Sequence, residues 1–194
     1  MTDFNELQYE YPQNRPSPLR SLIKEVWQTV LLSLLVFAVI NIATVRIRIQ
    51  SISMQPTLYE QDFVLVNKLA YKIGELNRRD VVVFQPPIES EREPYIKRVI
   101  GLPGDIVRVS DGVVFINDLP LQEAYEAAPP IYHGEWTVPQ GEVFVLGDNR
   151  NNSSDSHLWG MVPVENIIGK AVVVYWPFTH WKMLDPATAA AAGP

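Results

Sequence analysis

An apolar run near the N-terminus is the feature that most constrains how this chain folds. Val26–Val45 reads VWQTVLLSLLVFAVINIATV and carries no formal charge. As a helix, its length of about 20 residues matches the ~30 Å hydrocarbon core of a bilayer. Trp27 lies at the beginning of the run, where interfacial aromatic side chains are enriched. We therefore predict one transmembrane helix over residues 26–45, preceded by a disordered polar tail over residues 1–25.

Two other structures share part of this pattern. A cleaved signal peptide fits poorly, because the run is too long and because Thr44-Val45-Arg46 offers no small-x-small exit site. A buried core helix is an alternative, because the polar residues Gln28, Ser33 and Asn41 interrupt the apolar pattern.

The composition of the chain excludes several classes of site. There is no cysteine among the 194 residues, so disulfides, thiolate metal ligands and a cysteine nucleophile are ruled out. The net charge is -6 and there is no long basic run, so nothing indicates nucleic-acid binding. The three histidines lack the spacing of a metal site. We therefore predict no metal and no cofactor.

After the apolar run, the pattern changes to short apolar segments separated by turns. The chain contains 16 prolines, which are spread between the short apolar segments. This distribution of prolines favours strands and turns over long helices. We predict a mainly β domain of mixed barrel/sandwich type over residues 46–186. It carries a small irregular lobe near residues 119–140 and is followed by a disordered tail over residues 187–194. Asp111-Gly112 predicts a two-residue hairpin. The predicted strands are Val45–Ile49, Phe63–Val66, Asp80–Phe84, Tyr95–Ile100, Asp105–Val109, Val113–Ile116, Glu142–Leu146 and Gly169–Tyr175.

Ser53 is the first candidate for chemistry. It lies between an apolar, strand-like segment and the turn Pro56-Thr57. A serine on a rigid bend acts as a nucleophile when a base lies within hydrogen-bond reach. Taken alone, capping a turn or a short helix is the more common role of such a serine.

Lys97 is the strongest candidate for the base. It lies in an otherwise largely apolar strand, Tyr95–Ile100. A lysine accepts a proton only when it is neutral, and burial in an apolar pocket favours the neutral form. The commoner fate of such a lysine is to extend its ammonium group into solvent. His157 with Asp155 is a weaker alternative, because an acid two residues from its histidine usually points to the other side of a strand.

The loop Gly147–Ser156 is the third candidate region. Its sequence, GDNRNNSSDS, is dense in short hydrogen-bonding side chains. It fits an exposed polar loop or a loop that supports an active site. A calcium-binding loop is disfavoured, because Arg150, Ser153 and Trp159 occupy positions where that motif requires other residues.

Four sequence blocks occur in order after the predicted span. They are Ser53-Met54-x-Pro56-Thr57-Leu58, Arg79-Asp80-Val81-Val82-Val83-Phe84, Tyr95-Ile96-Lys97-Arg98-Val99-Ile100-Gly101-x-Pro103-Gly104-Asp105 and Gly147-Asp148-Asn149-Arg150-x-Asn152-Ser153-x-Asp155-Ser156. Together they resemble the type I signal peptidases, the membrane-bound bacterial leader peptidases that use a serine and a lysine. The resemblance implies a catalytic domain of signal-peptidase type and no metal or organic cofactor.

The resemblance also implies a role for each catalytic residue. Ser53 matches the nucleophile, and Lys97 matches the general base. Ser51 matches the side-chain oxyanion donor, with the Ser53 backbone N–H as its partner. Ser153 matches the hydroxyl that forms a hydrogen bond with the lysine.

Other residues match the structural part of the family's site. Asp148, Arg150 and Asp155 match residues that hold the site together. His157 stands where many relatives carry arginine, so the family's ion pair to Asp155 is in question here, although a histidine can still donate to that carboxylate. The family's large second lobe is reduced here to roughly residues 119–140.

The family's substrates are exported preproteins cut after a small-x-small sequence, usually Ala-x-Ala. We expect shallow apolar pockets beside Ser53 that accept alanine and exclude larger side chains by overlap. We also expect an extended substrate to add as a strand beside those flanking the nucleophile. The predicted pocket residues are Ile47, Ile49, Met54, Leu58, Tyr95 and Ile96.

The predicted partners are these preproteins and the lipid bilayer, with the translocation machinery as an open third partner. The predicted location is a bacterial cytoplasmic or thylakoid-type membrane, with the catalytic domain on the trans side. The positive-inside rule leans only slightly this way: Arg15, Arg20 and Lys24 precede the span, while Arg46 and Arg48 follow it.

Two other functions fit part of the sequence. A membrane-anchored β-domain that binds exported chains without cutting them would have no need of both Ser53 and Lys97. A self-cleaving repressor-type protease also uses a serine and a lysine. The predicted anchor and the absence of a DNA-binding N-terminal domain argue against it.

Overall fold

The structure of this chain is a computed structural model that describes residues 18–184. Residues 1–17 of the predicted N-terminal tail and the predicted tail over residues 187–194 lie outside the described residues. The chain divides into two units, Met1–Ile40 and Asn41–Pro194.

One long helix makes up the described part of the first unit. The helix α1 spans Pro18–Ala43, so residues 18–25 are helical rather than part of a disordered tail. A proline suits a first helical turn, because its missing N–H would have no partner there. The Thr29 hydroxyl donates to Glu25 O at 2.9 Å, and the Ser33 hydroxyl donates to Thr29 O at 2.8 Å. These polar groups are therefore satisfied within the helix.

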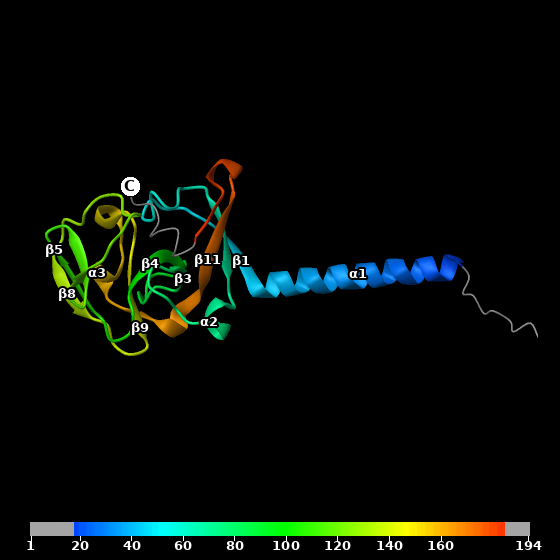
Figure 1. The fold of residues 1–194 in the computed structure, drawn as a ribbon, viewed down its shortest axis with the longest axis horizontal. Helices are drawn as coiled ribbons and strands as arrows, with labels where there is room; N and C mark the ends of the chain where they lie inside the picture. The colour runs from blue at the N-terminus through cyan, green and yellow to red at the C-terminus, as the bar shows by residue number, and fades with distance from the viewer. Residues whose placement is uncertain (1–17, 185–194) are drawn as a thin grey trace, which may run out of the picture. The chain divides into compact units, whose positions relative to one another are not determined.

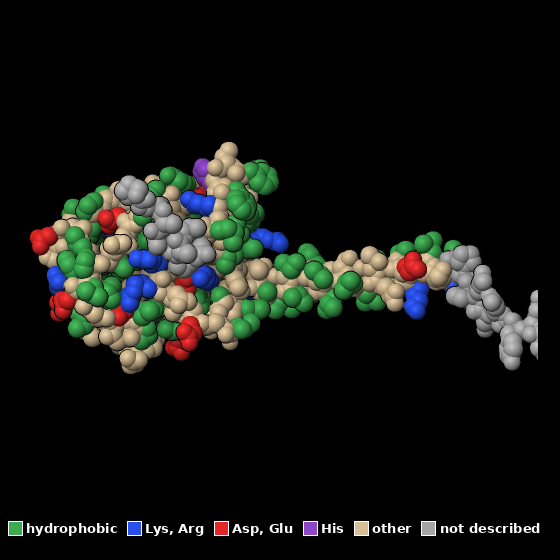
Figure 2. Space-filling model, in the orientation of Figure 1, with side chains coloured by type: hydrophobic (Ala, Val, Ile, Leu, Met, Phe, Trp, Pro, Cys, Tyr) green, Lys and Arg blue, Asp and Glu red, His purple; other side chains and the backbone are tan. Residues whose placement is uncertain are grey.

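The exposed apolar surface of α1 distinguishes it from a core helix. The most apolar 18-residue window of Leu19–Ala43 has a mean hydropathy of 2.1, and none of this window is buried in the protein. Figure 2 shows apolar side chains along the helix and charged ones near its start. Such a surface is unfavourable in water and suits a hydrocarbon environment.

The second unit is built on a curled antiparallel sheet of eight strands (Figure 1). The predicted strands that fall in it are all present, with ends shifted by one or two residues at most. Their order is β1 (Thr44–Arg48), β2 (Phe63–Asn67), β11 (Ile167–Trp176), β3 (Val81–Phe84), β4 (Tyr95–Gly101), β9 (Glu142–Leu146) and β10 (Val162–Pro163), and β12 (Lys182–Met183) pairs with β11.

A second sheet of four strands includes two short strands from the segment predicted as an irregular lobe, residues 119–140. Its order is β7 (Leu119–Pro120), β6 (Val113–Ile116), β5 (Ile106–Ser110) and β8 (Gly134–Thr137). The predicted hairpin joins β5 to β6, with positive φ at both Asp111 (52°) and Gly112 (78°), as a type I′ turn requires. Within the predicted lobe, the short strands β7 and β8 were not predicted, whereas residues 121–133 form no helix or strand.

Short helical turns connect the strands. They are α2 (Ala70–Ile73), α3 (Ser156–Trp159) and the 3₁₀ turns η1 (Arg150–Asn152), η2 (Val164–Asn166) and η3 (Phe178–His180).

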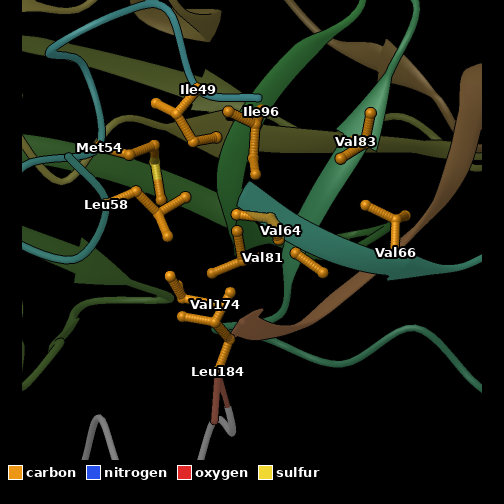
Figure 3. Close-up of a cluster of buried hydrophobic side chains, with 11 residues drawn as sticks. Ile49, Met54, Leu58, Val64, Val66, Val81, Val83, Ile96, Val174 and Leu184 are labelled. Atoms are coloured by element: carbon orange, nitrogen blue, oxygen red, sulfur yellow. The ribbon is translucent and has the colours of Figure 1, made fainter. Parts of the chain in front are cut away.

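The core beneath the loop that follows β1 anchors Ser53. Met54 and Leu58, next to the serine in sequence, are fully buried. They pack into a cluster with Val64, Val81 and Ile96 (Figure 3). The strands β2, β3 and β4 therefore provide a hydrophobic base for the loop that carries the serine.

We expect Leu58→Ala to lower the free energy of unfolding by about 2–5 kcal/mol, because it removes buried methyl groups and leaves a cavity. Denaturant unfolding of the full chain in detergent measures this. Leu119→Ala is the matched control, since Leu119 is 72% exposed, and its cost should stay within about 0.5 kcal/mol. Equal costs for the two variants would contradict the anchoring role of Leu58.

Candidate active site

The loop between β1 and β2 holds Ser53 in a defined turn. Two backbone hydrogen bonds join the two ends of this loop, from Ile49 N to Asp62 O (2.8 Å) and from Gln61 N to Ile49 O (2.9 Å). The Ser53 carbonyl oxygen accepts from Asn149 N at 3.0 Å. Ser53 itself is only 6% exposed. The serine is thus fixed between the hydrophobic core and the loop after β9.

Lys97 approaches Ser53 from β4, a strand of the same eight-stranded sheet as β1 and β2. It lies on β4 opposite Val82 of β3, and its Nζ is 2.6 Å from Ser53 Oγ. The residue is 4% exposed. Burial lowers the pKa of Lys97 to about 8, although the nearby carboxylates of Asp155 and Asp148 oppose this shift. A substantial fraction of this amine is therefore neutral near pH 8, as a general base requires.

Two donors lie next to the Ser53 hydroxyl. Ser51 Oγ is 3.2 Å from Ser53 Oγ, and Ser51 is exposed toward solvent. The Ser53 backbone N–H makes no hydrogen bond within the described part of the chain. A hydroxyl and a free N–H side by side suit the stabilisation of an oxyanion.

Ser53 and Lys97 lie in the wall of a cleft of about 530 Å³. One side of this cleft is formed by residues 47–53, and another by residues 93–97. Only one edge of β4 is paired at Tyr95–Lys97: these residues pair with β3, whereas the described pairing with β9 begins at Arg98. The cleft therefore exposes an open strand edge beside the serine.

The loop after β9 is held by buried charges. Asp148 and Asp155 are both fully buried. Asp148 accepts two hydrogen bonds from Arg98, at 2.8 and 2.6 Å. Asp155 accepts from Gly147 N at 2.9 Å and lies 2.6 Å from His157 Nδ1. The predicted contact between His157 and Asp155 is therefore present in this structure.

Comparison with known proteins identifies the family. The model of the family "Signal peptidase, peptidase S26" matches residues 22–176. The chain belongs to this signal peptidase family.

Individual relatives agree over most of the chain. A probable signal peptidase I-2 from Synechocystis sp. is 41% identical over 181 residues, which are 90% of this chain and 83% of the relative. Signal peptidase I from Leptolyngbya laminosa is 45% identical over 88% of this chain and 86% of its own length. A chloroplastic thylakoidal processing peptidase 1 from Arabidopsis thaliana is 44% identical over 66% of this chain and 41% of its own length.

Not every residue predicted for the signal peptidase's cleft lines it. Four of the predicted residues do: Ile47, Ile49, Tyr95 and Ile96. Met54 and Leu58 are instead fully buried in the core, because their side chains turn away from the cleft to anchor the loop. The cleft residues that the sequence did not indicate are Arg48, Gln50, Ile52, Val83, Glu93, Pro94, Asn152 and Ser154.

Ser153 also differs from its predicted role. Its hydroxyl is buried but has no hydrogen-bond partner within the described residues, so no bond to Lys97 is formed in this structure. The hydroxyl lies close to the Cα of Gly147, as does the Ser53 carbonyl oxygen. It is therefore within the site but unpaired.

The alternative base and the alternative metal loop find no support in the geometry. The His157 ring stacks on Tyr132 at 4.0 Å between ring centres and is not part of the cleft lining. No cluster of three or more metal-binding side chains occurs among the residues the structure describes.

Arg98 is the residue that sequence reasoning missed most clearly. It follows Lys97 on β4 and is 3% exposed. Besides the ion pair with Asp148, it donates to Thr57 Oγ1 at 3.2 Å and to Arg79 O at 3.0 Å. Its position in the block around Lys97 was the available signal, but a charged residue next to Lys97 in the chain does not by itself indicate burial.

We expect Gly147→Ala to abolish most activity. A Cβ at Gly147 would overlap the Ser53 carbonyl oxygen and Ser153 Oγ, so the Ser53 loop must move, and displacement by ~1 Å costs as much as 10²-fold in rate. Cleavage of a preprotein in detergent measures the loss. Gly141→Ala is the control, because a Cβ there meets no atom within 4 Å, although its positive φ makes the variant somewhat less stable. Wild-type turnover by Gly147→Ala would show that Ser53 tolerates this displacement.

Proposed function

We propose that this chain is a membrane-anchored serine endopeptidase that removes signal peptides from exported preproteins after small-x-small sites, usually Ala-x-Ala. The observation that carries the proposal is the 2.6 Å contact between Lys97 Nζ and Ser53 Oγ at the wall of the cleft. Membership of the signal peptidase family supports the removal of signal peptides in general.

Ser53 and Lys97 divide the chemistry between them. Neutral Lys97 accepts the hydroxyl proton of Ser53 as the Ser53 oxygen attacks the carbonyl carbon of the scissile bond. Ser51 Oγ–H and the Ser53 N–H donate to the oxyanion, and each such donor is typically worth about 3–4 kcal/mol of barrier. Lys97 then returns the proton to the leaving amine, which frees the C-terminal product. A water deprotonated by Lys97 hydrolyses the acyl–serine ester and regenerates Ser53.

The shape of the cleft supports a preference for small side chains. Its wall beside Ser53 carries Ile47, Ile49 and Ile96, whose branched side chains leave shallow apolar hollows. A large side chain would overlap them, whereas alanine fits. The open edge of β4 at Tyr95–Lys97 allows an extended substrate to add as a strand, which sets the register of the scissile bond.

The helix α1 supplies the anchor in this proposal. It directly precedes β1, and Ser53 follows its end by only ten residues, a reach of at most ~35 Å in extended chain. A cleavage site that emerges at the membrane surface would then meet the enzyme at raised local concentration. The proposed orientation places the catalytic unit on the trans side.

Ser53→Ala and Lys97→Ala should each lower the turnover of a preprotein with an Ala-x-Ala site by at least ~10³-fold, because residues that act as a unit fail together. The double variant should be no worse than either single one. Gel-based cleavage with full-length enzyme in detergent measures this. His157→Ala should retain far more activity than Lys97→Ala, because His157 contacts Asp155 but does not line the cleft. If it were inactive while Lys97→Ala stayed active, a histidine base would replace this mechanism.

We expect kcat/KM to rise with pH through a limb near pH 8. The sign follows from the role of the base: Lys97 works only when deprotonated, and burial lowers its pKa from 10.5 to about 8. Activity is therefore lost as the pH falls below this value. A limb near pH 10.5, or one unchanged in a weakly active Lys97→His variant, would show that another group titrates.

A further inference from the structure

Two buried arginines lie close to the active-site residues in the fold. Arg98 on β4 directly follows Lys97, and Arg150 lies in the loop after β9, three residues before Ser153. They are 3% and 1% exposed, respectively. Burial and, to a smaller extent, the charge of Arg150 lower the pKa of Arg98, but its contact with Asp148 raises that pKa overall. Two buried cations this close need compensation by more than one carboxylate.

The site itself supplies only part of this compensation. Asp148 pairs with Arg98 through two hydrogen bonds. Asp155 is occupied by Gly147 N–H and His157. Within the loop after β9, Arg150 makes one hydrogen bond, from Nε to Gly147 O at 3.1 Å. Its charge therefore has to be balanced from elsewhere.

The negative charge that balances Arg150 comes from residues 121–131, which lie between β7 and β8. We call this segment the clamp loop. Glu123 accepts two hydrogen bonds from Arg150, one of them at 2.7 Å, and Glu126 lies 3.3 Å from Arg150 Nη1. The Glu123 carboxylate also accepts from Tyr125 Oη at 2.8 Å. The buried ring of Tyr125 lies 3.9 Å from the guanidinium carbon of Arg98. One loop thus contacts both arginines.

Backbone contacts fix the clamp loop against the loop after β9. Ala127 N donates to Asp148 O at 2.9 Å. The Asn151 side chain accepts from Ile131 N at 3.0 Å and donates to Pro129 O at 3.0 Å. These bonds join segments of the second sheet to the residues that flank Ser53 and Lys97.

We propose that Glu123 and Tyr125 are positioning residues for the peptidase reaction, which act through Arg150 and Arg98 on the Ser53–Lys97 pair. This inference rests on the proposed function. Glu123 holds Arg150, whose Nε donates to the Gly147 carbonyl oxygen. Two residues after Gly147, Asn149 N donates to the Ser53 carbonyl oxygen at 3.0 Å. Tyr125 covers Arg98, which orients Asp148 and follows Lys97 in β4. Neither residue lines the cleft, so neither contacts substrate.

The experiment uses the full chain in detergent with a preprotein substrate, and counts competent sites with a serine-acylating inhibitor. Glu123→Gln should keep a wild-type fraction of titratable sites and a KM within about twofold, while kcat per titrated site falls at least about tenfold, as a small misplacement of reacting groups predicts. A merely structural role would instead lower the number of titratable sites and leave kcat per site unchanged.

A double-mutant cycle with Arg150→Gln tests whether the effect passes through Arg150. In that background the guanidinium through which Glu123 is proposed to act is absent, so adding Glu123→Gln should change kcat by less than about twofold. A full additional loss would overturn the route through Arg150. Tyr125→Phe keeps the ring over Arg98 and removes only the hydrogen bond to Glu123. It should lower kcat per site about threefold, as expected for one lost hydrogen bond.

Glu135→Gln is the matched control, because Glu135 is an exposed residue of β8 on the same sheet, and its kinetics should equal those of the wild type. If Glu123→Gln does not fold, Tyr125→Phe decides the question alone. Wild-type kcat per site in Glu123→Gln, or in Tyr125→Phe when only that variant folds, overturns the inference. The proposed function fails separately, if the wild type itself does not cut the preprotein or if Lys97→Ala does.

Discussion

The removal of Lys97 from water is the constraint on which the β-rich unit depends. A lysine with a pKa of about 8 is available as a base only while water stays away from its amine. Carboxylates nearby work against this state, because they stabilise the ammonium form. Asp148 and Asp155 lie within range of Lys97, and each is already engaged, Asp148 by Arg98 and Asp155 by Gly147 N–H and His157. The polar network therefore restrains the carboxylates that would otherwise hold a proton on the base.

Two kinds of contact, hydrophobic packing and a backbone hydrogen bond, fix the position of Ser53, the proposed nucleophile. On one side, Met54 and Leu58 bind its loop to a hydrophobic cluster (Figure 3), and on the other, Asn149 N binds its carbonyl oxygen. The hydrophobic contact is strong but allows small shifts, whereas the hydrogen bond sets direction. Gly147 completes this arrangement, since the space where a Cβ would lie is filled by Ser53 O and Ser153 Oγ. Both reacting groups are thus placed before any substrate arrives, which is the condition for electrostatic preorganisation.

Local patterns predicted the strands and the two candidate residues Ser53 and Lys97 better than they predicted the connections between the strands. Period-two segments located the strands, and Asp111-Gly112 located a hairpin, because both signals act over a few residues. Ser53 and Lys97 were found from short blocks and a family resemblance, and they lie 2.6 Å apart in the structure. Met54 and Leu58 were misassigned to the cleft, since which side of a loop faces the core depends on distant strands. Glu123 and Tyr125 gave no signal in the sequence. Glu123 pairs with Arg150, which lies 27 residues later in the chain, and the Tyr125 ring packs against Arg98 of β4. Contacts over such distances leave no local pattern.

The choice of charged rather than apolar residues around the loop after β9 has a physical rationale. Buried ion pairs seldom stabilise a fold more than well-packed apolar groups of the same volume would. What the planar guanidinium adds is direction, because its donors fix the orientation of a carboxylate or a carbonyl. Arg98 reaches Asp148, Thr57 and Arg79 at once, which are far apart in sequence. An apolar side chain at this position would fill the space but leave the angle between β4, the serine loop and the loop after β9 poorly defined. For the proposed reaction, in which the Lys97 amine must meet the Ser53 hydroxyl, that angle matters more than the net stability of the ion pair.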